Sequence, residues 1–208
     1  MLDFLSHHSH DLLHRTWEHL LMSAGTLSLA ACVAVPAGVV VSRHPRLSAL
    51  TLAFASVVQT VPSLALLGFF MVLTGRIGYL PSLLALFFYS LLPIFQNTLS
   101  GLRQVPASVR EAATAMGMTP SQVLWEVSVP LALPVIMAGL RTSAVLVIGT
   151  ATLCAFVGAG GLGVFINRGL ETVNANLVLL GVVPVSLIAL AADQLLAALG
   201  RRLAVPGS

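Results

Sequence analysis

The chain has 208 residues, of which 57% are hydrophobic and 8% are charged. An ordinary soluble domain has about 25% charged residues, so the composition argues against a water-soluble enzyme or binding domain. The net charge of +3 rests on arginine alone, since the chain has no lysine. In so apolar a chain this excess indicates membrane topology and not nucleic-acid binding.

Long runs without Asp, Glu, Lys or Arg dominate the chain, and we predict an all-α integral membrane protein with five transmembrane helices. The predicted helices are at least as long as the roughly 20 residues that an α-helix needs to cross a bilayer. They cover residues 20–42, 47–73, 79–100, 131–157 and 177–199. These bounds define an external N-terminal segment at 1–19, a transmembrane domain at 20–200 and a tail at 201–208.

Segment 1–19 is unusually rich in histidine, with His7, His8, His10, His14 and His19. Imidazole is a common metal ligand, but a metal site also needs a rigid scaffold that holds the ligands in place. We expect a loosely ordered tail and no bound metal, with a metal site as the alternative.

Proline interrupts two of the predicted spans. Pro62 follows Gln59 and Thr60 in the second span, and Pro93 lies late in the third. Proline removes a backbone donor and kinks a helix, and nearby polar side chains can bind the freed carbonyl. Gln59, Thr60 and Pro62 are therefore candidates for a substrate pathway, and a purely structural kink is the alternative.

The longest connection, 103–130, is predicted to form two short helices joined by a glycine turn. Pro106 suits a first helical turn, and the alanine-rich run after it favours helix. Gly117 is placed to end this helix with a left-handed cap. Thr119 and Gln122 then match a capping box at the start of the second helix. The pattern predicts a rigid hairpin.

One face of the first loop helix carries small and apolar side chains. Val109, Ala112, Ala113 and Met116 follow one another at three- and four-residue spacing. We expect this face to contact a partner protein, with the flanking Glu111 helping to set the register. A helix that lies on the membrane surface is the alternative.

Two charged residues lie well inside predicted spans, Arg141 in the fourth and Asp193 in the fifth. A lone charge at such depth is costly unless it pairs or reaches the interface. The two spans run in opposite directions, which brings the two charges to a similar depth. We predict that Arg141 and Asp193 pair, directly or through water. The alternative is that each snorkels separately to the membrane surface.

The glycine-rich segment 158–163 matches the spacing G-x-G-x-x-G. A dinucleotide site would need a preceding strand and an acidic residue about twenty positions further on. A predicted transmembrane helix precedes this segment, and Glu171 comes too early. We therefore expect a bend at the outer surface of the membrane. A P-loop is excluded as well, because that motif requires lysine.

Arginine placement indicates the orientation of the chain. One side of the predicted spans carries Arg43, Arg46, Arg103, Arg110, Arg201 and Arg202, and the other carries Arg15, Arg76 and Arg168. Arginine is enriched in cytoplasmic loops. We therefore expect the N-terminus outside, and loop 103–130 and the C-terminus in the cytoplasm.

The loop contains Glu111-Ala112-Ala113-Thr114-Ala115-Met116-Gly117, followed by Pro130-Leu131-Ala132-Leu133-Pro134. This pattern resembles the EAA loop of ABC-importer permeases. The resemblance implies a five-helix permease core of the type I importer kind. It also implies that Glu111, Ala112, Ala113, Met116 and Gly117 couple this chain to a cytoplasmic ABC ATPase subunit.

Other segments resemble the osmoprotectant branch of these permeases, which moves glycine betaine, choline, carnitine and related quaternary amines. The segments are Gln59-Thr60-Val61-Pro62-Ser63-Leu64-Ala65, Leu91-Leu92-Pro93-Ile94, Asn97-Thr98, Gly149-Thr150-Ala151-Thr152-Leu153 and Val157-Gly158-Ala159-Gly160-Gly161-Leu162-Gly163. Gln96 departs from the branch, in which a basic residue precedes the Asn-Thr pair. The resemblance adds Asn97 to the candidate pathway. Transport of another small solute, such as an amino acid, is the alternative.

The resemblance also implies the partners and the location of the chain. It implies two ATPase subunits, a second permease copy or a paralogue, and a separate extracytoplasmic substrate-binding protein. The chain itself would bind no cofactor and catalyse no reaction, because ATP and Mg²⁺ are used by the ATPase. The expected location is the bilayer of the bacterial cytoplasmic (inner) membrane, crossed several times.

Two other classes of function were weighed against a permease. An ion-coupled secondary transporter would need carboxylates within the membrane, and Asp193 is the only one well inside a predicted span. A membrane enzyme would have to use the histidines. These lie outside the predicted spans and lack a set of carboxylates as partners. Both classes fit the sequence less well than an ABC permease.

Overall fold

The computed structural model describes the backbone of residues 2–203 and the side chains of residues 9–203. The regular structure of the described residues is helical. The elements are α1 (Leu2–Val41), α2 (Pro45–Thr60), α3 (Ser63–Thr74), α4 (Tyr79–Gln104), α5 (Ala107–Ala115), α6 (Pro120–Gln122), the π-helix η1 (Val123–Ser128), α7 (Val129–Ala151), the 3₁₀-helix η2 (Thr152–Val157), α8 (Gly163–Glu171) and α9 (Ala175–Leu203).

This is an all-helical membrane protein. Four stretches of helix are long and apolar enough to cross a bilayer: Ser9–Val41, Tyr79–Gln104, Pro120–Val157 and Ala175–Leu203. The pair α2 and α3 passes the same test when taken together, which gives up to 5 spans. The predicted number of spans is therefore confirmed when the pair counts as one.

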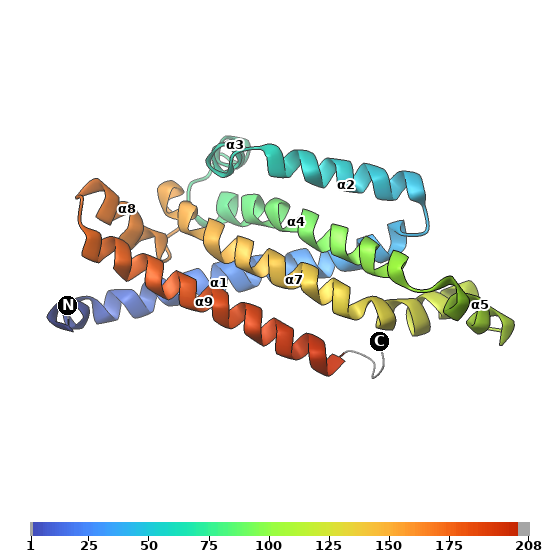
Figure 1. The fold of residues 1–208 in the computed structure, drawn as a ribbon. Helices are drawn as coiled ribbons and strands as arrows, with labels where there is room; N and C mark the ends of the chain where they lie inside the picture. The colour runs from blue at the N-terminus through green and yellow to red at the C-terminus, as the bar shows by residue number, and fades with distance from the viewer. Residues whose placement is uncertain (1, 204–208) are drawn as a thin grey trace.

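The long helices α1, α4, α7 and α9 pack side by side along most of their length (Figure 1). Helix α2 lies along α4 on the side away from α9 (Figure 1). Helix α5 projects at one end of the bundle, and α8 packs against α9 at the other end, where α1 begins (Figure 1). The described ends of the chain thus lie at opposite ends of the bundle.

Small residues let the two central helices approach closely. A Cβ atom on Gly139 of α7 would lie 2.6 Å from the Cβ of Asn97 on α4. One on Gly101 of α4 would lie 3.0 Å from the carbonyl oxygen of Ala132 on α7. In a membrane, helices associate through such close van der Waals packing. The hydrophobic effect does not drive them together, because lipid tails are as apolar as the side chains.

The outer surface of the bundle is apolar. Val72 is 86% exposed and Leu195 is 71% exposed. In the most apolar 18-residue stretch of α9, 17% of the stretch is buried within the chain, and the rest is partly or fully exposed. Contiguous apolar surface of this extent is not stable in water and is matched by lipid.

Helix α1 differs from the prediction at its beginning. It runs without a break across the predicted boundary at residues 19 and 20, so the expectation of a loosely ordered tail is wrong. Leu12 packs against a buried cluster that includes Phe165 and Leu180, and His19 is fully buried. This packing supports the N-terminal half of α1. The side chains of His7 and His8 and the tail residues 204–208 lie outside the described residues.

The predicted kink at Pro62 is confirmed, and it is a complete break. Helices α2 and α3 meet at an angle of 101°. Pro62 is the residue immediately before α3 and has no amide hydrogen to continue the helix. The second span is therefore two helices joined at a sharp turn.

The predicted bend in segment 158–163 is also confirmed. Gly158, Gly160 and Gly161 have φ angles of 75°, 79° and 76°, which side chains disfavour. Helix α8, which follows, was not predicted. Its nine residues lie in the connection between the fourth and fifth predicted spans.

Candidate coupling hairpin and transport pathway

The loop between α4 and α7 begins with the predicted helix and glycine turn. Helix α5 ends in a Schellman motif: the amide of Met118 donates to the carbonyl of Ala113 at 3.2 Å, and that of Gly117 donates to Thr114 at 2.9 Å. Gly117 has a φ of 91°. The left-handed glycine cap is therefore confirmed.

The second part of the loop begins with the predicted capping box. The Thr119 amide donates to Gln122 Oε1 at 2.9 Å, and the Gln122 amide donates to Thr119 Oγ1 at 3.4 Å. The expectation of a separate second helix is wrong, however, because α6 continues through η1 and α7 as one stretch from Pro120 to Val157. In the π-helical turn the Val129 amide donates to Leu124, and this wide turn accommodates the missing amide of Pro130.

Helix α5 and the turn after it are exposed at the end of the bundle. Glu111, Ala112, Met116 and Gly117 are exposed, Met116 by 77%. Ala113 is buried, with 2% exposure, so it packs against its own chain and does not present a surface to a partner. The predicted contact face is wrong at this residue, because α5 packs against η1 and Ala113 is buried.

The exposed side of α5 is offset from the predicted face. A shallow hollow on it is lined by Ala107, Arg110, Glu111, Thr114 and Ala115. These residues recur at three- and four-residue spacing and so form one stripe of the helix. Glu111, which was expected only to flank the contact, lies within this stripe.

The polar residues around the break in the second span bind backbone groups. Gln59 Nε2 donates to the carbonyl of Tyr89 on α4 at 3.1 Å, and the Tyr89 hydroxyl donates to the carbonyl of Val61. Thr60 Oγ1 donates to the Val57 carbonyl at 2.7 Å. Gln59 therefore ties the break to α4, and Pro62 is exposed beside it.

Aromatic rings support the same break. Phe88 on α4 stacks on Phe70 of α3, with ring centroids 5.4 Å apart. It also meets Phe54 of α2 edge to face at 6.3 Å. One ring thus contacts both halves of the broken span.

Asn97 lies further along α4, and its contacts are separate from those of Gln59 and Thr60. Its Nδ2 donates to the carbonyl of Pro93 at 2.8 Å. Its side chain lies where α4 passes Gly139 of α7. The structure therefore places Asn97 at the α4–α7 crossing and the other three candidate pathway residues at the α2–α3 break.

The two intramembrane charges lie together. Arg141 Nε donates to Asp193 Oδ1 at 2.8 Å, and Arg141 Nη2 donates to Asp193 Oδ2 at 2.9 Å. The side chains are 38% and 23% exposed. The pair therefore bridges α7 and α9 near the surface of the single chain and leaves part of each group open to a neighbour.

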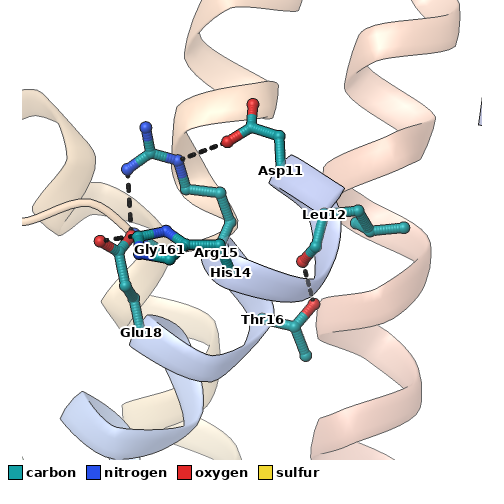
Figure 2. A network of polar contacts seen from close by, with 7 residues as sticks. All are labelled: Asp11, Leu12, His14, Arg15, Thr16, Glu18 and Gly161. Atoms are coloured by element: carbon teal, nitrogen blue, oxygen red, sulfur yellow. Dashed lines mark hydrogen bonds and ion pairs between the residues drawn. The ribbon is translucent and has the colours of Figure 1, made fainter. Parts of the chain in front are cut away.

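A polar network holds the opposite end of the bundle (Figure 2). Glu18 Oε2 accepts a hydrogen bond from the Gly161 amide at 2.9 Å and one from Arg15 Nη1 at 3.0 Å. Arg15 Nε also lies 3.3 Å from Asp11 Oδ1, and His14 Nδ1 lies 3.6 Å from Glu18 Oε1. The carboxylate of Glu18 thus joins α1 to the glycine-rich segment before α8.

The glycines of this segment are required by the approach of α1. A Cβ on Gly160 would lie 2.5 Å from Glu18 Oε2, and one on Gly161 would lie 3.2 Å from His19 Nδ1. His19 Nε2 lies 3.0 Å from the carbonyl oxygen of Ile148. The sequence pattern indicates the glycines, but nothing in it links them to Glu18 or His19.

Among the side chains of residues 9–203, no three of His, Cys, Asp and Glu lie close enough to hold a metal ion. The polar side chains described above instead bind backbone groups of neighbouring segments or, as Arg141 and Asp193 do, pair with each other.

Comparison with known proteins identifies the family of the chain. Residues 31–205 match the family model described as "Binding-protein-dependent transport system inner membrane component". The choline transport system permease protein OpuBB of Bacillus subtilis is 42% identical over 207 residues, which cover 100% of this chain and 95% of that protein. The carnitine transport permease protein OpuCB of Listeria monocytogenes is 43% identical over 98% of this chain and 93% of its own length.

The fold is similar to that of a solved transporter. A chain from an inward-facing structure of the MetNI methionine ABC transporter matches with a TM-score of 0.74 and 27% sequence identity. The match covers 90% of this chain and 95% of the other. The expected type I importer architecture is therefore confirmed. The chain belongs to the binding-protein-dependent inner membrane permeases and is a multi-pass, non-catalytic subunit of an ABC importer.

Proposed function

We propose that this chain forms the membrane path of an importer for quaternary-amine osmoprotectants such as choline, carnitine or glycine betaine. The proposal rests on similarity along nearly the whole chain to permeases that are named for these solutes. The identity of 42% to 43% extends over both ends of the bundle. It is not confined to the loop 103–130, which we call the coupling hairpin.

The end of the bundle that carries α5 faces the cytoplasm in this proposal. Arg43, Arg46, Arg103 and Arg110 are at this end, in the turn after α1 and around α5. Arginine favours the cytoplasmic side of a membrane. The N-terminus then lies outside and the C-terminus inside.

The partners follow from this orientation. A cytoplasmic ABC ATPase subunit docks on the exposed stripe of α5 and on the turn at Met116 and Gly117. Glu111 gives this surface a negative charge beside the positive charge of Arg110 in the same stripe. ATP and Mg²⁺ bind to the ATPase, and movement of α5 passes through the continuous helix Pro120–Val157 to the membrane path.

The extracytoplasmic binding protein delivers the solute at the α8 end, and a second permease subunit completes the path. Gln59, Thr60, Pro62 and Asn97 lie along this chain's contribution to it. A broken span suits such a path, because irregular backbone within a membrane is stable only where protein or water surrounds it. A quaternary ammonium has no hydrogen to donate and is bound through aromatic faces. Near the break, Phe54, Phe70 and Phe88 pack on one another, and we assign selection of the solute to the binding protein.

Uptake in cells that carry this chain with its partners tests the proposal. Labelled choline, carnitine and glycine betaine should be imported, and each should compete with the others. Import should continue when the proton gradient is dissipated, provided that ATP is maintained.

The alternative solute is an amino acid, which the similarity to a methionine transporter favours. Methionine should neither be imported nor compete with choline. Import of methionine alone would contradict the osmoprotectant proposal but leave the ABC class of the protein intact. Loss of import on dissipating the gradient, at constant ATP, would contradict coupling to an ATPase.

A further inference from the structure

A cavity of about 220 Å³ lies behind the coupling hairpin. Three arginines line it, each from a different part of the chain: Arg43 from the turn after α1, Arg103 from the last turn of α4, and Arg110 from α5. We call this cavity, with its three arginines, the basic pocket.

The positive charges of the basic pocket are not neutralised within the described residues. Among the described residues, the arginines that form ion pairs are Arg15 and Arg141, and neither lines the pocket. Arg43 donates one hydrogen bond, from Nη2 to the carbonyl of Pro120 at 3.1 Å. The acidic residues of the hairpin, Glu111 and Glu126, do not line the pocket. Since each guanidinium has five N–H donors, most of these donors are available to a ligand.

The other groups of the pocket limit what that ligand can be. Ser42 and Ser128 line it, but their hydroxyl groups already donate to the carbonyls of Val39 and Val123 at 2.7 and 3.0 Å. Leu102 and Leu124 add apolar surface. The pocket therefore offers both cationic donors and hydrocarbon surface, which fits an anion with an apolar body.

The depth of the pocket indicates the source of the anion. Arg43 comes two residues after the end of α1, and Arg103 comes one residue before the end of α4. Both spans leave the hydrocarbon region at this level, where lipid phosphates are located. Basic pockets between transmembrane helices at this level bind anionic headgroups.

We propose that the basic pocket binds the phosphate of an anionic phospholipid, held by Arg43, Arg103 and Arg110. The glycerol end of the lipid rests on Leu102 and Leu124. Because Arg110 is on α5, while Arg43 and Arg103 lie at the ends of α1 and α4, the bound headgroup ties the coupling hairpin to the bundle.

Lipid binding to the purified full chain tests this proposal. The chain, in mild detergent, is titrated with phosphatidylglycerol or with phosphatidylcholine, and the bound lipid is counted by native mass spectrometry. The wild type should prefer phosphatidylglycerol. At about 1 kcal/mol per arginine, the double variant Arg103→Gln/Arg110→Gln should bind it roughly thirtyfold more weakly. Arg103→Lys/Arg110→Lys should keep part of the affinity, since lysine retains the charge but not the planar fork.

Arg201→Gln is the matched control. It removes one positive charge from the last turn of α9, outside the pocket, and should bind phosphatidylglycerol as the wild type does. Equal binding by the wild type and the double glutamine variant would overturn the proposal, as would an equal loss in Arg201→Gln. Inorganic phosphate at matched concentration should not displace the lipid, and displacement would overturn the lipid assignment in favour of a small-anion site. All three pocket arginines are exposed, so the variants should elute from a sizing column as the wild type does.

Discussion

Arg141 and Asp193 meet in a two-point ion pair although they are 52 positions apart in the chain. The planar fork of the guanidinium matches both carboxylate oxygens, an arrangement that lysine cannot reproduce. The pair joins α7 and α9 within the span region, where each charge alone would be costly.

Breaking this pair should reduce the amount of folded protein. Arg141→Ala or Asp193→Ala leaves an unpaired charge, which is unfavourable within a span and less so where it reaches water. The swap Arg141→Asp/Asp193→Arg should recover much of the loss. The fraction of monodisperse protein after heating measures the effect, with Thr142→Ala, the next residue of α7, as the control. A swap no more stable than the single variants would show that the charges act separately by snorkelling.

The turn of the coupling hairpin should be sensitive to backbone conformation and insensitive to side-chain size. Gly117 has a φ of 91°, and no atom lies within 4 Å of the position that its Cβ would occupy. Gly117→Val should cost about 1–2 kcal/mol locally, whereas Gly117→Asn should be tolerated because asparagine adopts left-handed backbone more readily. ATPase association and uptake should fall in the valine variant while membrane insertion is unchanged. Equal activity of both variants would argue against a role for the turn in coupling.

Glu111 should contribute to ATPase docking through its exposed position in the α5 stripe. Glu111→Ala should weaken association with the ATPase and lower uptake, since it removes an acid that lines the hollow. Co-purification of the two subunits measures this. Glu126→Ala is the control, because Glu126 is an exposed acid of the same loop outside the hollow. Similar losses in both variants would indicate a general effect of loop charge.

Glu18 should hold the segment before α8 against α1. Glu18→Ala leaves the Gly161 amide without its acceptor, which costs about 1–3 kcal/mol when the amide is buried. Hydrogen exchange in residues 158–163 should accelerate, whereas Glu18→Gln should retain much of the protection because its amide oxygen still accepts. Asp11→Asn is the control, since Asp11 reaches only Arg15 in this network (Figure 2). Unchanged exchange in Glu18→Ala would show that packing alone holds the segment.

The close crossing of α4 and α7 should tolerate no added side chain. A Cβ on Gly139 would lie 2.8 Å from the carbonyl oxygen of Pro93, in addition to its contact with Asn97. Gly139→Val should therefore destabilise the bundle by about 1–3 kcal/mol. Gly149→Val on the same helix is the control, because a Cβ there meets no atom within 4 Å. Gly139→Val should aggregate at a lower temperature than Gly149→Val. Identical aggregation curves would contradict a close α4–α7 crossing at Gly139.

Local sequence patterns predict the number and approximate position of the spans, the break at Pro62 and the glycine cap of the first loop helix. Each of these depends on a few neighbouring residues: a run without charges, a missing amide, a left-handed φ, or the reach of Gln122 back to Thr119. Such effects act within about one or two helical turns and are therefore visible in local patterns. The same patterns carry the resemblance to the permease family.

Which side chains meet across the bundle is known only from the packing of the helices. Glu18 and Gly161 are 143 positions apart, and no periodicity relates them. The burial of Ala113 and the continuity of α1 both depend on where a second helix packs. The basic pocket exists only because the turn after α1, the last turn of α4 and helix α5 come together in space. Contacts of this kind are set by the distance and rotation between helices, which the local pattern of a single helix does not contain.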